Sequence, residues 1–204
     1  MIGLIDYGLG NIRAFLNVYK RLNMPCLIAS KPKDLKQATR LVLPGVGAFD
    51  EAMDLLAKSG MREPLEEMVL GRKLPLLGVC VGMQMLAKSS EEGHSAGLGW
   101  IDGRVRKFDE TKLVQKPRLP HMGWNQIVAK GSNPLLRELE NESRFYFLHS
   151  YYFHCEAESE VIAETEYGAP FSSAVAAGNI FGVQFHPEKS HGNGVKLLKN
   201  FGQL

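Results

Sequence analysis

Apolar residues in the first half of the chain repeat one arrangement three times. Short apolar runs at 2–6, 41–43 and 76–79 are each followed by a glycine-containing turn and a second apolar segment. After the first two runs, apolar residues recur at i, i+3, i+4 and i+7, which predicts helices that begin near Ile12, after Asn11 as N-cap, and near Phe49. A third helix is expected over 83–87. Alternating strands and helices predict a parallel sheet that is covered by helices.

The pattern changes after about residue 97, where strand-like segments follow one another with short links. They are expected at 103–108, 121–128, 144–153, 161–166, 172–176 and 180–185, before a closing helix at 193–201. The whole chain therefore predicts an α/β fold with an open, mostly parallel, flavodoxin-like sheet, helices on both faces and antiparallel additions in the C-terminal half. No internal repeat is present, so residues 1–204 are expected to form a single domain.

Composition and charge restrict the possible partners. The formal net charge of +2 is too small to indicate nucleic acid binding. The longest apolar stretch, 74–86, is shorter than the ~20 residues that span a bilayer, and Asp6 interrupts the N-terminal apolar run, so neither membrane insertion nor a signal peptide is expected. Three separate cysteines and no HxH or HExxH spacing predict a cytoplasmic protein without disulfides or metal.

Cys80 stands between two glycines in Gly78-Val-Cys-Val-Gly82, where a buried strand is expected to meet a helix. This is the thiol version of the nucleophile elbow, in which a strained turn projects the nucleophile away from the sheet. Glycines on both sides let neighbouring backbone pack closely, and the dipole of the following helix favours the thiolate. Cys26 and Cys155 lack this frame and are expected to be core residues.

His186 is the best candidate for a base. It lies at the end of a strand-like run, and Pro187 keeps it extended, so Glu188 can face the same side and orient the imidazole. The other histidines are expected to be exposed, at 94 and 191, or structural, at 121, 149 and 154.

A second glycine turn, Pro44-Gly-Val-Gly47, follows the strand at 41–43. Acyl chemistry needs backbone N–H donors where negative charge develops on oxygen, and glycine lets a peptide plane turn over at low cost. Gly8 and Gly10 match the first two glycines of the dinucleotide-binding motif GxGxxG. Arg13 occupies the position of the third glycine, so a dinucleotide site is rejected.

Taken together, these segments resemble the class I (triad) glutamine amidotransferases, and most of all the glutaminase subunits of imidazole glycerol phosphate synthases. The resemblance extends over essentially the whole chain. The matching stretches are Asp6-Tyr-Gly-Leu-Gly-Asn11, Leu43-Pro-Gly-Val-Gly-Ala-Phe49, Leu77-Gly-Val-Cys-Val-Gly-Met-Gln84, Ser89-Ser-Glu-Glu-Gly93, Pro120-His-Met-Gly-Trp-Asn125, His149-Ser-Tyr151 and Gln184-Phe-His-Pro-Glu-Lys-Ser190.

The resemblance implies hydrolysis of L-glutamine to glutamate and ammonia, without a cofactor. Cys80 would form a glutamyl thioester, His186 would act as acid and base, and Glu188 would orient it. The resemblance also implies an oxyanion hole and a glutamine-binding wall. The oxyanion hole would use N–H groups of Val81 and of Gly45, Val46 or Gly47. The residues implied in glutamine binding are Gln84, Glu92, His149, Ser150 and Tyr151.

The resemblance further implies a partner, a (β/α)₈-barrel synthase that receives the ammonia through an internal channel and makes imidazole glycerol phosphate and AICAR in histidine biosynthesis. Residues that match segments near that interface are Tyr7, Asn11, Trp124, Tyr146 and Lys189. The stretches 12–23 and 99–103 are also similar to relatives that feed a sugar amidotransferase in surface-polysaccharide (O-antigen) synthesis, so the acceptor stays open. Glutaminase activity is expected to be low without the partner.

Two functions of other classes remain as alternatives. A stand-alone cysteine hydrolase or peptidase would explain Cys80 and His186 but not their combination with Gln84, Glu92 and the turn at 44–47. A non-catalytic binding module would not need an intact triad.

Overall fold

The structure, a computed structural model, describes residues 1–114, 116–139 and 143–204. Its centre is an eight-stranded sheet in the order β2-β1-β3-β4-β13-β12-β11-β8. The first five of these strands are parallel to one another, and the last three continue the sheet antiparallel. Their bounds are β1 Ile2–Ile5, β2 Cys26–Ala29, β3 Arg40–Gly45, β4 Leu76–Cys80, β8 Val128–Ala129, β11 Val161–Glu166, β12 Pro170–Ala177 and β13 Ile180–Val183.

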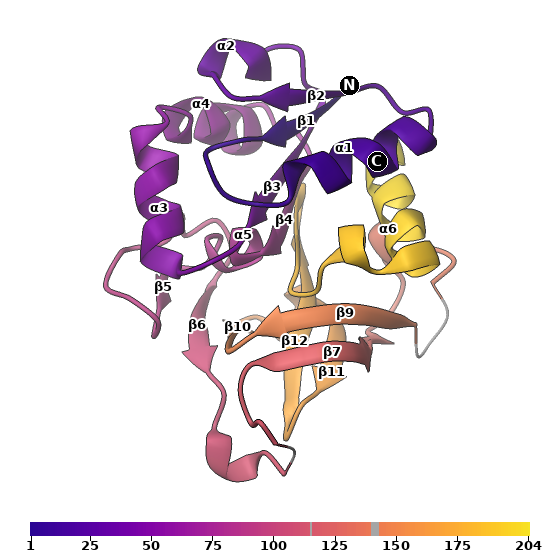
Figure 1. Cartoon of the computed structure of the whole chain (residues 1–204). Coiled ribbons are helices and arrows are strands. Elements are labelled where there is room, and N and C mark those ends of the chain that lie inside the picture. The colour runs from indigo at the N-terminus through magenta and orange to yellow at the C-terminus, as the bar shows by residue number, and fades with distance from the viewer. Residues whose placement is uncertain (115, 140–142) are drawn as a thin grey trace.

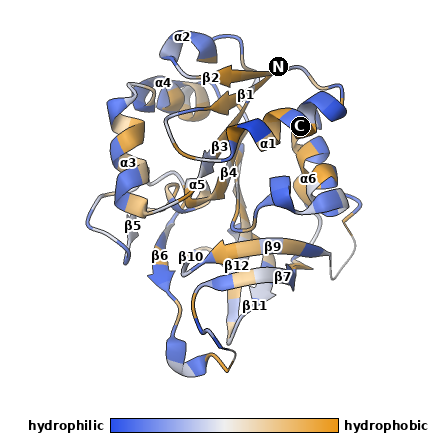
Figure 2. Cartoon of the chain, in the orientation of Figure 1, coloured by the Kyte–Doolittle hydropathy of each residue, from blue (hydrophilic) through white to orange (hydrophobic). Residues whose placement is uncertain are grey.

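Helices cover both faces of this sheet, as the alternating pattern predicts. Helices α1 and α6 lie on one side, and α3 and α4 lie on the other (Figure 1). Their bounds are α1 Ile12–Arg21, α2 Pro32–Leu35, α3 Phe49–Lys58, α4 Arg62–Glu66, α5 Val81–Gln84 and α6 His191–Gln203. Every residue of β1 and β4 is buried. In Figure 2 the strands β1 and β2 are hydrophobic in colour, whereas α1 and α3 alternate between hydrophobic and hydrophilic, so the core lies between the layers.

Two small sheets complete the C-terminal half. One has the order β10-β6-β5, and the other pairs β7 with β9 as an antiparallel ribbon. The β7–β9 ribbon crosses below the carboxyl ends of β3 and β4 (Figure 1). Bounds are β5 Ser89–Ser90, β6 Gly103–Lys107, β7 His121–Gln126, β9 Arg144–His149 and β10 Tyr151–Cys155. Short 3₁₀ turns are η2 Glu110–Lys112, η3 Pro134–Leu136, η4 Glu158–Glu160 and η5 Pro187–Lys189.

Several predicted boundaries are wrong for local reasons. The helix expected over 83–87 is α5 Val81–Gln84, because the turn at Cys80 reverses the chain within one residue. Strand β3 continues through Gly45, so only the end of the expected turn at 44–47 is a turn. Asn11 stands at the N-cap of α1, but its side chain makes no capping hydrogen bond.

Two larger features also differ from the prediction. The segment 144–153 is two strands, β9 and β10, which break at Ser150 and join different sheets. Helix α4 and the π turn that continues it, η1 Glu67–Gly71, were not predicted. Their buried face is nevertheless marked in the sequence, because Leu65 and Met68 follow Met61 by four and seven positions. Among the described residues, no helix is both long and apolar enough to cross a membrane.

Candidate active site

Cys80 is the last residue of β4, and its backbone is strained. Its φ is 55° and its ψ is −114°, a conformation that a residue with a side chain rarely adopts, and α5 begins at the next residue. A β-carbon on Gly78 would stand 2.6 Å from the Gly82 carbonyl oxygen, and one on Gly82 would stand 1.9 Å from the Leu43 carbonyl oxygen. The two glycines are therefore required because β4, α5 and β3 pack backbone against backbone around the thiol.

His186 and Glu188 form a buried pair beside this elbow. The imidazole Nδ1 donates to Glu188 Oε1 at 2.9 Å, and both side chains are almost completely buried. The His186 backbone is also fixed, since its N–H donates to the Tyr146 carbonyl at 2.8 Å and its carbonyl accepts from Ser190 Oγ at 2.6 Å. With Nδ1 bound to Glu188, Nε2 is left for the thiol.

Electrostatics favour the protonated form of this imidazole. Burial lowers the pKa of His186, but hydrogen bonds to Cys80 and Glu188, together with their charges, outweigh it and raise that pKa to about 10. The pair of thiol and imidazole can therefore exchange a proton inside the site, and Glu188 stabilises the imidazolium that results.

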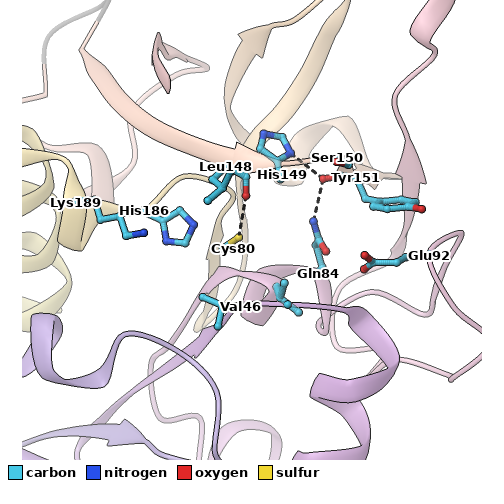
Figure 3. A pocket seen from close by; sticks show the side chains of 12 residues that line it. Val46, Cys80, Gln84, Glu92, Leu148, His149, Ser150, Tyr151, His186 and Lys189 are labelled. Carbon is cyan, nitrogen blue, oxygen red and sulfur yellow. Dashed lines mark hydrogen bonds between the residues drawn. The ribbon is translucent and has the colours of Figure 1, made fainter. Parts of the chain in front are cut away.

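A cleft with a volume of about 150 Å³ opens in front of Cys80. Its size can accommodate a small ligand such as a single amino acid. At the cleft, the Cys80 thiol donates to the Leu148 carbonyl at 3.9 Å (Figure 3). From behind the cleft, the buried Gln184 Nε2 donates to the sulfur at 3.8 Å. The lining residues are Val46, Gly47, Cys80, Val81, Gln84, Glu92, Leu148, His149, Ser150, Tyr151, His186 and Lys189.

Gln84 and Glu92 lie on the side of the cleft away from His186 (Figure 3). Gln84 Nε2 donates to the Tyr151 carbonyl at 2.9 Å and to Gln184 Oε1 at 3.1 Å, so both of its protons are used. Glu92 Oε2 accepts from the Phe49 N–H at 2.9 Å, at the first turn of α3. Burial raises the pKa of Glu92, and the Phe49 N–H opposes this shift. Its carboxylate points into the cleft.

A series of hydrogen bonds supports the segment 149–151, which also lines the cleft. His149 Nδ1 donates to the Tyr151 carbonyl at 2.8 Å, while its Nε2 pairs with Nδ1 of His121 at 2.9 Å. His121 Nε2 in turn accepts from Asn125 Nδ2 at 3.2 Å. Both rings are neutral, because burial lowers the pKa of His121 to about 4 and lowers the pKa of His149 well below its ordinary value. These hydrogen bonds fix the tautomers of both histidines. They also fix the position of the Tyr151 carbonyl, to which Gln84 donates.

Comparison with known proteins identifies the family to which this geometry belongs. The model of the family described as "Glutamine amidotransferase class-I" matches residues 4–203. The chain belongs to the class I glutamine amidotransferase family. It is therefore an amidotransferase with glutaminase chemistry, as the resemblance implies.

Curated relatives agree with this assignment, and solved structures share the fold. "Imidazole glycerol phosphate synthase subunit HisH" of Leptospira interrogans is 52% identical over 204 residues, and the protein of the same name from Bdellovibrio bacteriovorus is 53% identical over 204 residues; in both pairs the match covers 100% of each chain. A crystal structure of a glutamine amidotransferase has a TM-score of 0.76 at 19% identity and covers 100% of this chain and 99% of its own. PurLQS from Thermotoga maritima has a TM-score of 0.76 at 15% identity, over 98% and 96% of the two chains.

The structure of this amidotransferase brings nearly all of the predicted site residues together. Of the residues that line the cleft, Leu148 was not predicted and Lys189 was predicted only for the partner interface; the others were predicted as site residues. Glu188 lies behind His186 and not in the cleft itself. Gly45 does not line the cleft either, because it lies in β3, where a β-carbon would stand 2.5 Å from the Gly82 nitrogen.

The predicted interface residues lie at or near the surface with one exception. Asn11 and Lys189 are exposed, Trp124 is 40% exposed, and Tyr146 is half-buried. Tyr7 is only 5% exposed, and its hydroxyl donates to Met85 Sδ at 3.6 Å, so it is a buried residue and not a surface contact.

Sequence reasoning missed Gln184 and treated His121 only as a structural residue. Gln184 is a polar residue inside an apolar strand-like run, two positions before His186, so extended geometry already places it on the same side as the proposed base. The pairing of His121 with His149 comes from the β7–β9 register, in which the two residues are opposite each other. In the part of the chain that the structure describes, no group of three or more His, Cys, Asp or Glu side chains is arranged to hold a metal ion.

Proposed function

We propose that this chain is the glutaminase subunit of an imidazole glycerol phosphate synthase, and that it hydrolyses L-glutamine and delivers the ammonia to a (β/α)₈-barrel subunit. The observation that carries the proposal is the strained Cys80 elbow beside the buried His186–Glu188 pair, in a cleft of amino-acid size. The full-length relatives at 52% and 53% identity, both bearing that synthase subunit's name, support the choice of acceptor reaction.

In the proposed reaction, Cys80 Sγ attacks the side-chain amide carbon of glutamine. His186 gives a proton to the leaving nitrogen, so ammonia departs and a glutamyl thioester remains. Water then attacks the thioester carbon while His186 takes a proton from it, which releases glutamate and restores the thiol. The N–H of Val81, with an N–H from residues 45–47, would stabilise the negative oxygen in both steps.

The amino-acid end of glutamine would lie toward Glu92. Its carboxylate points into the cleft and can pair with the α-ammonium group, while Gln84 offers its remaining acceptor, Oε1. The backbone of His149, Ser150 and Tyr151 closes this end of the cleft.

The outer face of the β7–β9 ribbon is the proposed docking surface for the barrel subunit. Met122 is 60% exposed and lies opposite Leu148, which is 37% exposed and also lines the cleft. Trp124 lies opposite Tyr146, and Lys189 Nζ lies 5.7 Å from the Tyr146 ring centroid. An exposed apolar face at the rim of a catalytic cleft suits a partner that must receive ammonia before it reaches water. The relatives described above do not support a sugar amidotransferase as the partner.

The decisive experiment reconstitutes the chain with a barrel synthase subunit and compares two nitrogen sources. With glutamine, Cys80→Ala is expected to abolish product formation, whereas added ammonium salt is expected to restore it because the barrel subunit is intact. Glutamate release that is unchanged in Cys80→Ala would refute the proposed nucleophile. Equal glutamate release with and without the barrel subunit would refute activation by the partner.

A further inference from the structure

A carboxylate outside the cleft holds the loop that carries Glu92. Asp50, in the first turn of α3, accepts the His94 N–H with both oxygens, at 3.1 and 2.9 Å, and accepts the Ser95 N–H at 2.9 Å. The loop packs so closely around this side chain that a β-carbon on Gly93 would stand 2.1 Å from Asp50 Oδ1. The backbone of residues 93–95 thus surrounds one carboxylate, and we call this arrangement the Asp50 clamp.

Glu92 immediately precedes this clamp. Its own carboxylate accepts from the N–H of Phe49, the residue before Asp50, so two successive helix residues hold residues 92–95. Asp50 itself does not line the cleft. The hydrogen bonds from the His94 and Ser95 N–H groups lower the pKa of Asp50, as expected for donors that stabilise the carboxylate form.

We propose that Asp50 is a positioning residue that sets the preference of the site for an α-amino acid, because it holds Glu92 where the carboxylate meets the α-ammonium group of the substrate. The inference rests on the proposed role of Glu92 in glutamine binding. The ion pair between Glu92 and the α-ammonium group depends on the position of the carboxylate. Without Asp50, the loop 92–95 would have to become ordered each time a substrate binds, and this cost would weaken binding. Loss of the clamp should therefore weaken recognition of the ammonium group more than it slows the chemistry at Cys80.

The test compares glutamine with glutaramic acid, which has the same amide and carboxylate but no α-amino group. In the complex with the barrel subunit, the ratio of kcat/KM for the two substrates measures recognition of the ammonium group alone. Asp50→Ala is expected to raise KM for glutamine and to reduce this ratio about tenfold, with kcat nearly unchanged. Asp50→Asn retains one carbonyl acceptor and is expected to retain much of the ratio. The matched control is Asp54→Asn, which removes an exposed charge from the same helix, where Asp54 pairs with Lys58, and should behave as the wild type.

Glu92→Gln separates failure of this inference from failure of the proposed function. If Glu92→Gln leaves the ratio unchanged, the proposed ammonium contact is wrong. If Glu92→Gln reduces the ratio and Asp50→Ala does not, the role of Asp50 is refuted.

A second perturbation reaches the clamp from the loop side. Gly93→Ala places a methyl group against the Asp50 carboxylate and is expected to lower the substrate ratio as Asp50→Ala does. The double variant should be no worse than the more affected single variant, because the obstructing carboxylate is gone. Additive losses would show that the two residues act independently and would refute the clamp.

Discussion

Replacement of Gly82 by alanine tests whether the elbow is held by direct contact between backbone segments. The new β-carbon would stand 1.9 Å from the Leu43 carbonyl oxygen and 2.9 Å from the Leu43 carbonyl carbon. Contacts of a β-carbon below 3.0 Å essentially never occur, so α5 and β3 must separate by about 1 Å. Neither side can yield by a rotamer change, because the obstacle is backbone in a buried strand.

The expected cost follows from that displacement. Overpacking in a core costs about 1–3 kcal/mol, and an obstacle of backbone places Gly82→Ala near the upper end, at about 3 kcal/mol. The Val81 N–H, one residue away, would move with α5. A misplacement of about 1 Å in a catalytic group can lower the rate about 10²-fold, so glutamate release should fall by up to about 10²-fold even from the molecules that stay folded.

The assay combines urea unfolding with glutamate release in the presence of the barrel subunit. Gly192→Ala is the matched control, because a β-carbon there meets no atom within 4 Å and Gly192 lies in α6. That variant should unfold within about 1 kcal/mol of the wild type and retain its activity. If Gly82→Ala unfolds within about 0.5 kcal/mol of the wild type and keeps half of its activity, the steric argument is refuted.

Two histidines and the turn at Gly47 give the remaining predictions. The Glu188 carboxylate helps to hold the His186 pKa at about 10, so Glu188→Gln should move the alkaline limb of the kcat/KM profile to lower pH; an unmoved limb would contradict this. Between its ordinary pKa of 6.5 and its folded pKa of about 4, His121 gains a proton only in the unfolded chain, so it should contribute up to roughly 3 kcal/mol to the fall in unfolding free energy as pH falls through this window. In His121→Gln, urea unfolding at both ends of the window should show a smaller fall. Gly47 has a φ of 87° and no contact closer than 3.4 Å, so Gly47→Ala should cost about 1 kcal/mol through backbone strain and lower kcat for glutamine more than it raises KM.

The catalytic centre could be predicted from sequence because each of its parts depends on local chemistry. Gly78 and Gly82 mark a place where backbone approaches backbone, and the structure confirms this with contacts that leave no room for a β-carbon. His186 and Glu188 are two residues apart in an extended segment, so their pairing needs no knowledge of the rest of the fold. The strand–turn–helix repeats likewise predicted the parallel half of the sheet, because each repeat is a local pattern of apolar residues.

Features that depend on distant packing could not be predicted in the same way. The hydrogen bonds from His121 through His149 to the Tyr151 carbonyl exist only because β7 pairs with β9 in one register. Tyr7 was expected near the partner surface, but its burial follows from its contact with Met85, which is 78 positions away and which no local pattern specifies. Asp50 resembles an ordinary first-turn carboxylate in the sequence, because its loop partners are more than 40 positions away.

The cleft joins two walls that differ in how firmly they are held. On one side, β4, α5 and β3 are locked by glycines that touch backbone, and His186 is fixed by its backbone and by Glu188. On the other side, a β-carbon on Gly47 would meet only the Glu51 carboxylate, at 3.4 Å, and Val46 is 37% exposed. A nucleophile must keep its geometry throughout the reaction, whereas oxyanion donors are needed only once substrate is bound. Any movement in the cycle is therefore expected at Val46 and Gly47, next to the first turn of α3, where Asp50 also holds Glu92. If the proposed roles of Glu92 and of residues 46 and 47 hold, substrate recognition and oxyanion stabilisation share one helix terminus, and a partner that acts on this wall is expected to change the rate without disturbing Cys80.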